Sequence, residues 1–319
     1  MNTQVATSST DNNSTILGCS ISGVDDTEVV IKVRACTFYQ NMPETLNNSL
    51  SIKNDKDSSP LNRSLTGIIQ STGERVESFN DGDRVIVCHT DGVLSESKRV
   101  QVFQVVSLPR EISFEEGAIA HHLPTVLNGI EKAKVKDKSV FINGAGSTGL
   151  LSTQVSRISG SKNIIVSDLY SKRLQNAKDL GADAVVDVST EDVHRRIMAM
   201  TSNHGVDVSI DCVGNEESFS QCVNNLRRGG TLVVLQSHLM EVSINLQEWS
   251  ERSLQLIMGK EQPFETPYLL ARGLKLVCIG AIKLRPLLTH VFPAHRITEA
   301  INLVEGHPNL AVEVVLVQR

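Results

Sequence analysis

The sequence predicts an α/β protein built from a β-rich first part and a second part with a parallel sheet. Three observations support this prediction. Short strand patterns separated by turn residues occupy roughly the first hundred positions. From about residue 114, strand-like and helix-like stretches alternate, which is typical of parallel βαβ units. A glycine-rich loop then joins one of these strands to the helix that follows it.

Composition narrows the protein class before any motif is considered. The chain has 319 residues, enough for about two domains. With 40% hydrophobic residues it can bury a core, and a net charge of −5 argues against a general nucleic-acid binder. No apolar run approaches the ~20 residues needed to span a bilayer. Six cysteines without C-x-x-C spacing indicate free thiols and a cytoplasmic location. Residues 1–16 are rich in Ser, Thr and Asn, so we expect a disordered leader. They lack the apolar core of a secretory signal.

The β-rich part begins with a strand over 27–36, in which Val29, Ile31 and Val33 alternate with more polar positions. Residues 41–63 are poor in apolar side chains and are expected to be mostly loop. Strand patterns return at 66–70 and 84–87, with a turn between them.

The second part opens with apolar residues at helical spacing over 114–133, followed by a short apolar strand at 139–143. Expected helices then alternate with expected strands until a final helix and strand near the end of the chain. The helices are 149–159, 171–180, 190–202, 216–226 and 297–305, and the strands are 163–167, 184–187, 206–210, 231–236 and 312–317.

The loop after the strand at 139–143 has the pattern G-x-G-x-x-G. Its first glycine permits a tight turn, the second lets the backbone approach a pyrophosphate, and the third lets the helix pack on the strand. The fingerprint also requires an acidic residue at the end of the next strand, and Asp168 supplies it. Its carboxylate favours the ribose hydroxyls of NAD and opposes the 2′-phosphate of NADP. The expected cofactor is therefore NAD, bound by Gly144, Gly146, Ser147, Thr148, Gly149 and Asp168.

The order of several motifs resembles the medium-chain dehydrogenase/reductase superfamily, and most closely its zinc-type polyol, butanediol and threonine dehydrogenase branch. The motifs are Glu28–Ala35, Gly82–Val85, Asp168–Leu174, Gly205–Gly214, Arg228–Val233 and Leu288–Pro293. This resemblance implies a GroES-like β catalytic domain over 17–121 and 266–319. It also implies a Rossmann NAD-binding domain over 122–265, with Arg173, Val213 and Gly214 as further cofactor residues.

The resemblance also shows what this chain lacks. The family's catalytic zinc usually takes a Cys, a His-Glu pair and sometimes a further Glu. The corresponding positions here are Tyr39, Asn62-Arg63-Ser64 and His121. The cysteine-rich lobe of the structural zinc is missing, and no His or C-x-x-C lies between residues 20 and 88. We therefore expect no metal.

Without zinc, the developing alkoxide of an alcohol substrate needs another proton acceptor or electrophile. Tyr39, His121 and His122 are the catalytic candidates, with a pocket-filling tyrosine and structural histidines as the alternatives. A metal ion bound incidentally by His89, His121 and His122 is a further alternative. Cys36 and Cys212 are expected to be core residues.

Two functions remain open. One is a zinc-independent NAD(H) oxidoreductase acting on a small alcohol/ketone pair, an activated carbonyl or an enone. The other is a weakly active or inactive NAD-binding paralogue with a structural, sensing or partner-binding role. A homodimer or homotetramer is expected because the apolar run 254–258 follows the last strand of the βαβ series. The alternative is that a helix or the 261–280 segment covers this run within one chain.

Overall fold

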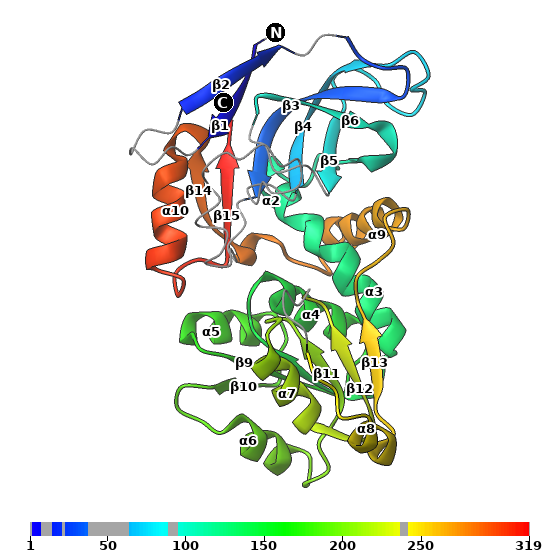
Figure 1. Cartoon of the computed structure of the whole chain (residues 1–319), viewed down its shortest axis with the longest axis vertical. Coiled ribbons are helices and arrows are strands. Elements are labelled where there is room, and N and C mark those ends of the chain that lie inside the picture. Colours follow the sequence, from blue (N-terminus) through cyan, green and yellow to red (C-terminus); the bar gives the residue numbers. More distant parts are fainter. Residues whose placement is uncertain are drawn as a thin grey trace. The chain divides into compact units, whose positions relative to one another are not determined.

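The computed structural model describes residues 2–7, 15–20, 23–37, 64–88, 95–236 and 242–318 (Figure 1). The chain forms two compact units. The first comprises Met1–His121, Leu270–Cys278 and Leu284–Arg319, and the second comprises His122–Leu269 and Ile279–Lys283.

A seven-stranded mixed sheet forms the centre of the first unit, with strand order β14-β15-β3-β4-β5-β7 and β6 paired to β3. Val29, Ile31 and Val33 are buried in its core whereas Lys32 is exposed, so the sequence alternation marks the buried face correctly. The strands are β3 (Glu28–Thr37), β4 (Ser64–Thr72), β5 (Arg84–Cys88), β6 (Ser97–Gln101), β7 (Val105–Ser107), β14 (Leu288–Pro293) and β15 (Glu313–Val317).

The helical spacing over 114–133 is confirmed, but these residues form two helices with a short turn between them. The structure has α2 (Phe114–Ile119), the 3₁₀ turn η2 (Ala120–His122) and then α3 (Leu123–Ala133). Pro124 lies in the first turn of α3, where its missing N–H is tolerated, and a proline there starts a new helix rather than continuing an old one. The first unit also contains η1 (Val102–Gln104), η3 (Arg285–Leu287), η4 (Ala294–Arg296) and α10 (Ile297–Gly306), and α9 (Thr266–Cys278) spans both units.

Where the sequence predicts a disordered leader over 1–16, the structure instead has a strand. Strand β1 (Asn2–Thr7) pairs antiparallel with β2 (Thr15–Ser20), and Asn2 lies opposite Ser20. The β-branched residues Thr3, Val5, Thr7, Thr15 and Ile16 occur in these segments, and such residues favour extended backbone. The expected loop at 41–63 lies outside the described residues.

The second unit is built on a six-stranded sheet in the order β10-β9-β8-β11-β12-β13, with every pair parallel. The α/β class, with a parallel doubly wound sheet and a separate mixed sheet, is therefore confirmed. The apolar run at 254–258 is itself largely the edge strand of this sheet. The strands are β8 (Ser139–Asn143), β9 (Asn163–Asp168), β10 (Ala184–Asp187), β11 (Val206–Asp211), β12 (Leu226–Val234) and β13 (Gln255–Met258).

Helices cover both faces of the parallel sheet, as right-handed crossovers require. One face carries α3, α4 (Ser147–Ile158) and α5 (Ser171–Asp179). The other carries α6 (Val193–Met200), α7 (Glu216–Asn224) and α8 (Leu246–Arg252). Because Phe141, Ile165 and Leu232 pack under this second helix layer at 0–1% exposure, the sheet is a rigid platform for the loops at its ends.

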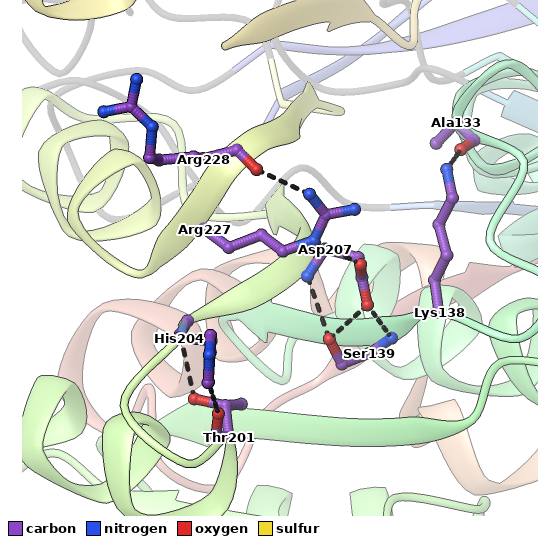
Figure 2. Close-up of polar contacts among 9 residues, drawn as sticks. Ala133, Lys138, Ser139, Thr201, His204, Asp207, Arg227 and Arg228 are labelled. Atoms are coloured by element: carbon purple, nitrogen blue, oxygen red, sulfur yellow. Dashed lines mark hydrogen bonds and ion pairs between the residues drawn. The ribbon is translucent and has the colours of Figure 1, made fainter. Parts of the chain in front are cut away.

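The amino-terminal ends of three strands of the parallel sheet are joined by a cluster of polar side chains around Asp207 (Figure 2). Ser139 donates its backbone N–H and its hydroxyl to Asp207 Oδ2, at 2.7 and 2.6 Å. Arg227 Nε donates to Asp207 Oδ1 at 2.6 Å, and Arg227 Nη1 donates to the Arg228 carbonyl. One carboxylate thus ties the starts of β8, β11 and β12 together. Burial raises the pKa of Asp207, but the hydrogen bonds from Ser139 and the Arg227 charge together lower it below its usual value.

Among the described residues, no helix is both long and apolar enough to cross a bilayer. Cys36, Cys88, Cys212, Cys222 and Cys278 are free thiols. Burial raises the pKa of the Cys36 thiol to about 12, and Cys36 is a core residue at 1% exposure, as expected.

Candidate cofactor site

The glycine loop connects β8 to α4 and has the backbone geometry of a phosphate-binding turn. Gly144 has φ +96°, which favours glycine. A Cβ on Gly149 would lie 1.8 Å from the Gly144 carbonyl oxygen, so this position admits only glycine. A Cβ on Gly146 would meet no atom within 4 Å, and Gly146 is the N-cap of α4. The open space therefore lies in front of a helix amino terminus that begins with Ser147 and Thr148, which is the arrangement that binds pyrophosphates.

Asp168 ends β9 beside this loop. Its Oδ2 accepts from the Ala145 backbone N–H at 2.7 Å, and its Oδ1 accepts from the Tyr170 N–H at 2.9 Å. A carboxylate offers about four acceptor positions, so these two bonds leave capacity for ribose hydroxyls. Asp168 thus holds the glycine loop in place and presents an acceptor next to it.

Arg173 lies in the first turn of α5. Its guanidinium carbon is 4.8 Å from the centre of the Tyr170 ring, a cation–π distance. This arrangement places an aromatic ring and a cation directly after Asp168, on the side of the loop away from β11.

A second carboxylate, Asp211, organises the end of β11 and is fully buried. Its Oδ1 accepts from the N–H groups of Val213 and Gly214, at 3.0 and 3.2 Å, and its Oδ2 accepts from Ser218 Oγ at 3.1 Å. The Val213 side chain lies against the glycine loop, because a Cβ on Gly144 would be 2.8 Å from Val213 Cγ2. Val213 and Gly214 are thus brought to the same loop as the expected phosphate-binding residues.

The sequence analysis did not single out Asp211, nor the Asn143–Ser167 pair beneath the loop. Ser167 Oγ donates to Asn143 Oδ1 at 3.0 Å, and Asn143 Nδ2 donates to the Ser218 carbonyl at 3.3 Å. A sequence signal was present, because four strands of the series end on Asn143, Asp168, Asp187 and Asp211. Burial, followed by the Asp211 charge, raises the pKa of the neighbouring Cys212 thiol, which therefore stays protonated and inert.

The two candidate histidines are adjacent in the chain but belong to different units. His121 Nδ1 is 3.1 Å from the Ala118 carbonyl oxygen, which can only accept. Nδ1 therefore carries the proton, and Nε2 is the basic nitrogen of the neutral ring. His122 Nδ1 is 3.3 Å from Thr148 Oγ1, so His122 is joined to the first turn of α4.

No group of three or more His, Cys, Asp or Glu side chains is arranged to hold a metal ion within the parts of the chain that the structure describes. Tyr39, Asn62, Arg63 and His89 lie outside those parts. Ser64, at the former Glu position, is fully buried at the start of β4.

Several known proteins are similar to this chain. Residues 147–272 match the family of zinc-binding dehydrogenases. L-idonate 5-dehydrogenase from Vitis vinifera is 29% identical over 265 residues, covering 73% of this chain and 71% of that protein. L-threonine 3-dehydrogenase from Pyrococcus abyssi is 31% identical over 206 residues, and this chain spans 58% of its length. Both relatives are named dehydrogenases, which supports the expectation of a dehydrogenase-like oxidoreductase.

The fold also matches solved structures over the whole chain. An alcohol dehydrogenase from Escherichia coli CFT073, solved with NADH, has a TM-score of 0.84 at 20% identity, with 100% of both chains covered. The fold, the glycine loop and the matched relatives agree with the resemblance found in the sequence. The chain is therefore similar to the zinc-type dehydrogenases of the medium-chain dehydrogenase/reductase superfamily, with the family match lying over residues 147–272.

Proposed function

We propose that the protein is a zinc-independent oxidoreductase that transfers hydride between NAD(H) and a small alcohol/ketone pair, an activated carbonyl or an enone. The observation that supports this most directly is the glycine loop. Gly149 has no room for a Cβ, Gly146 opens onto free space at a helix amino terminus, and Asp168 holds the Ala145 N–H beside both. This combination fits a dinucleotide and has no evident purely structural use.

Different residues of the chain would bind different parts of the cofactor. The amino terminus of α4 would neutralise the pyrophosphate, and Asp168 would accept from the adenosine ribose. Arg173 and Tyr170, which pack together at 4.8 Å directly after Asp168, would contact the adenine. Asp211 would keep the turn at Val213 and Gly214 closed against the loop. When bound, the nicotinamide supplies the hydride or accepts it.

The proton that accompanies hydride transfer needs an acceptor or donor on the protein. His121 Nε2 is suited to this role, because the bond to Ala118 fixes the tautomer and the ring orientation. We retain Tyr39 as the second candidate, since its phenol replaces the family's cysteine ligand. His122, joined to Thr148, would instead position α3 against the phosphate-binding helix.

The preference for NAD over NADP rests on Asp168. A 2′-phosphate on the adenosine ribose would meet a carboxylate that is already fixed by the Ala145 and Tyr170 N–H groups. The negative charges of the phosphate and of the Asp168 carboxylate would be held close together, which disfavours the binding of NADP.

The second candidate function is an NAD-binding paralogue with little or no turnover. It is favoured by Tyr39, Arg63 and Ser64 at the positions where relatives carry metal ligands. A direct NADH titration, run beside NADH oxidation with a panel of ketones, quinones and enones, separates the two. Turnover of any panel member supports the enzyme, whereas tight binding without turnover favours the paralogue.

Metal independence has its own test. Elemental analysis of protein purified without added metal should find well under one zinc per chain, and activity should survive a chelator. About one zinc per chain, lost in His121→Ala, would contradict this part of the proposal.

The functional proposal includes a cytoplasmic location and a homodimer or homotetramer.

A further inference from the structure

Glu261 is a buried carboxylate that the sequence analysis does not use. It lies two residues past Gly259, in the loop between β13 and α9, and is 5% exposed. Its Oε2 accepts from Thr125 Oγ1 on α3 at 2.8 Å. Its Oε1 accepts from Thr266 Oγ1, at the first residue of α9, at 3.1 Å. A buried carboxylate is costly unless hydrogen bonds satisfy it, so these contacts belong to a specific arrangement.

The loop that carries Glu261 is held closely against α3. Asn128 Nδ2 donates to the Gly259 carbonyl at 2.8 Å. A Cβ on Gly129 would lie 3.3 Å from Gly259 Cα, and a Cβ on Gly259 would lie 3.3 Å from the Thr125 carbonyl oxygen. Two glycines therefore let the helix and the end of β13 approach each other. That approach brings Thr125 within hydrogen-bond reach of Glu261.

The strand order assigns this loop to one half of the proposed dinucleotide site. The glycine loop follows β8, near the middle of the sheet, and Asp168 on β9 directs the adenosine toward β9 and β10. The other mononucleotide must then lie over the carboxyl ends of β11, β12 and β13. The backbone bonds Cys212 N–H to Asn143 O, Leu235 N–H to Asp211 O and Gly259 N–H to Val234 O continue each ladder past its strand end. Residues 259–266 therefore begin at the nicotinamide end.

We propose that Glu261 is a positioning residue for the nicotinamide half of the cofactor. It fastens the loop 259–266 to α3 on one side and to the start of α9 on the other, so that the loop keeps one conformation at that end of the sheet. Glu261 acts through the loop backbone and touches neither substrate nor cofactor. The inference rests on the proposed function, because it presumes a dinucleotide at the glycine loop.

The test compares a complete cofactor with a fragment that lacks nicotinamide. Calorimetric titrations of the full chain with NADH and with ADP-ribose are made for the wild type, Glu261→Ala and Glu261→Gln. Glu261→Ala should bind NADH about tenfold or more weakly, because two bonds to a charged acceptor are lost. ADP-ribose affinity should change less than about twofold. Glu261→Gln should recover most of the NADH affinity, since its amide oxygen can accept from one threonine while its NH₂ donates to the other.

Two further variants keep the test decisive. Gln262→Ala shortens an exposed side chain of the same loop outside the buried cluster and keeps the backbone bond to Glu265, so it should leave both affinities unchanged. Thr125→Val deletes one hydroxyl donor at nearly constant volume, and it should reproduce the selective NADH loss if Glu261→Ala fails to fold. Equal losses for NADH and ADP-ribose in both Glu261→Ala and Thr125→Val, or no loss in either, would overturn the inference. A wild type that binds neither ligand would overturn the proposed function and the inference together.

Discussion

The two ends of the parallel sheet in the second unit use the same chemical group for different purposes. At the amino-terminal end, Asp207 bonds Ser139 and Arg227 and ties three strands together. At the carboxyl-terminal end, Asp168 and Asp211 bond backbone N–H groups of the turns at Ala145, Val213 and Gly214. A carboxylate stabilises both ends, so a carboxylate alone does not identify a ligand site.

The difference lies in the backbone around each carboxylate. The carboxyl ends of the strands lead into the amino terminus of α4 and into Gly146, where a Cβ would meet no atom within 4 Å. The amino-terminal end has a carboxylate whose partners are side chains and a strand N–H, with an arginine opposite its charge. Ligand affinity should therefore respond to changes at one end only, whereas stability should respond at both.

The largest effect is expected at Gly149. In Gly149→Ala the new Cβ would lie 1.8 Å from the Gly144 carbonyl oxygen, so the loop must open. We expect at least a hundredfold loss of NADH affinity, with a lower Tm. Gly146→Ala is the matched control, because its Cβ meets nothing and its φ is −71°. It should keep the wild-type Tm and weaken only NADH binding. Wild-type affinity in Gly149→Ala would contradict the assignment of the loop.

A change of cofactor preference is expected next, at Asp168. The wild type should bind NADH roughly tenfold to a hundredfold more tightly than NADPH, from about 1–3 kcal/mol of like-charge opposition. Asp168→Ser removes that charge and should narrow the gap, and it should also weaken NADH binding because the Ala145 N–H loses its acceptor. Equal dissociation constants for the two cofactors in the wild type would refute the preference.

At the opposite end of the sheet, Asp207→Asn should lower the free energy of unfolding by about 1–3 kcal/mol at pH 7 and leave NADH affinity unchanged. The folded state lowers the pKa of Asp207, so its contribution is complete above the unfolded-state pKa and is lost as pH falls through the folded-state pKa. The stability difference between wild type and Asp207→Asn should therefore shrink in acid. Urea unfolding at pH 7 and below pH 4 measures it. A difference that grows in acid would reverse the sign of the argument.

The last change lies at the lateral edge of the sheet, where we expect little effect on cofactor binding. In β13, Leu256 and Met258 are 41% and 53% exposed, and the strand pairs only with β12 among the described strands. Dimerisation would cover this apolar edge. Ile257→Lys should weaken the oligomer and leave NADH affinity within about twofold, because the glycine loop follows β8, and β11 and β12 lie between β8 and the edge strand. A wild-type mass near 34.8 kDa by light scattering would exclude the oligomer.

The sequence predicts the parallel sheet well because β8, β9 and β11 are short strands rich in apolar residues that each end on a polar residue. It also predicts the turn at Gly144–Gly149, since steric limits at the glycines are local. It does not predict the break at Ala120–His122, because Pro124 gives a similar pattern in the first turn of a new helix and inside a longer helix. The partners of Asp211 and Glu261 are also beyond it. Thr125 lies 136 positions from Glu261, and only the approach of α3 to β13 brings them together.

Hydrogen–deuterium exchange of the full chain, with and without saturating NADH, tests the contrast between the two ends most directly. It reports on both ends of the same sheet in one experiment. We expect slower exchange in peptides covering 143–150 and 211–216, where bound phosphate and ribose would protect the backbone N–H groups. Peptides covering 136–140 and 225–230 should exchange at the same rate in both states. Protection at the amino-terminal end, or an unchanged glycine loop at saturation, would contradict the account.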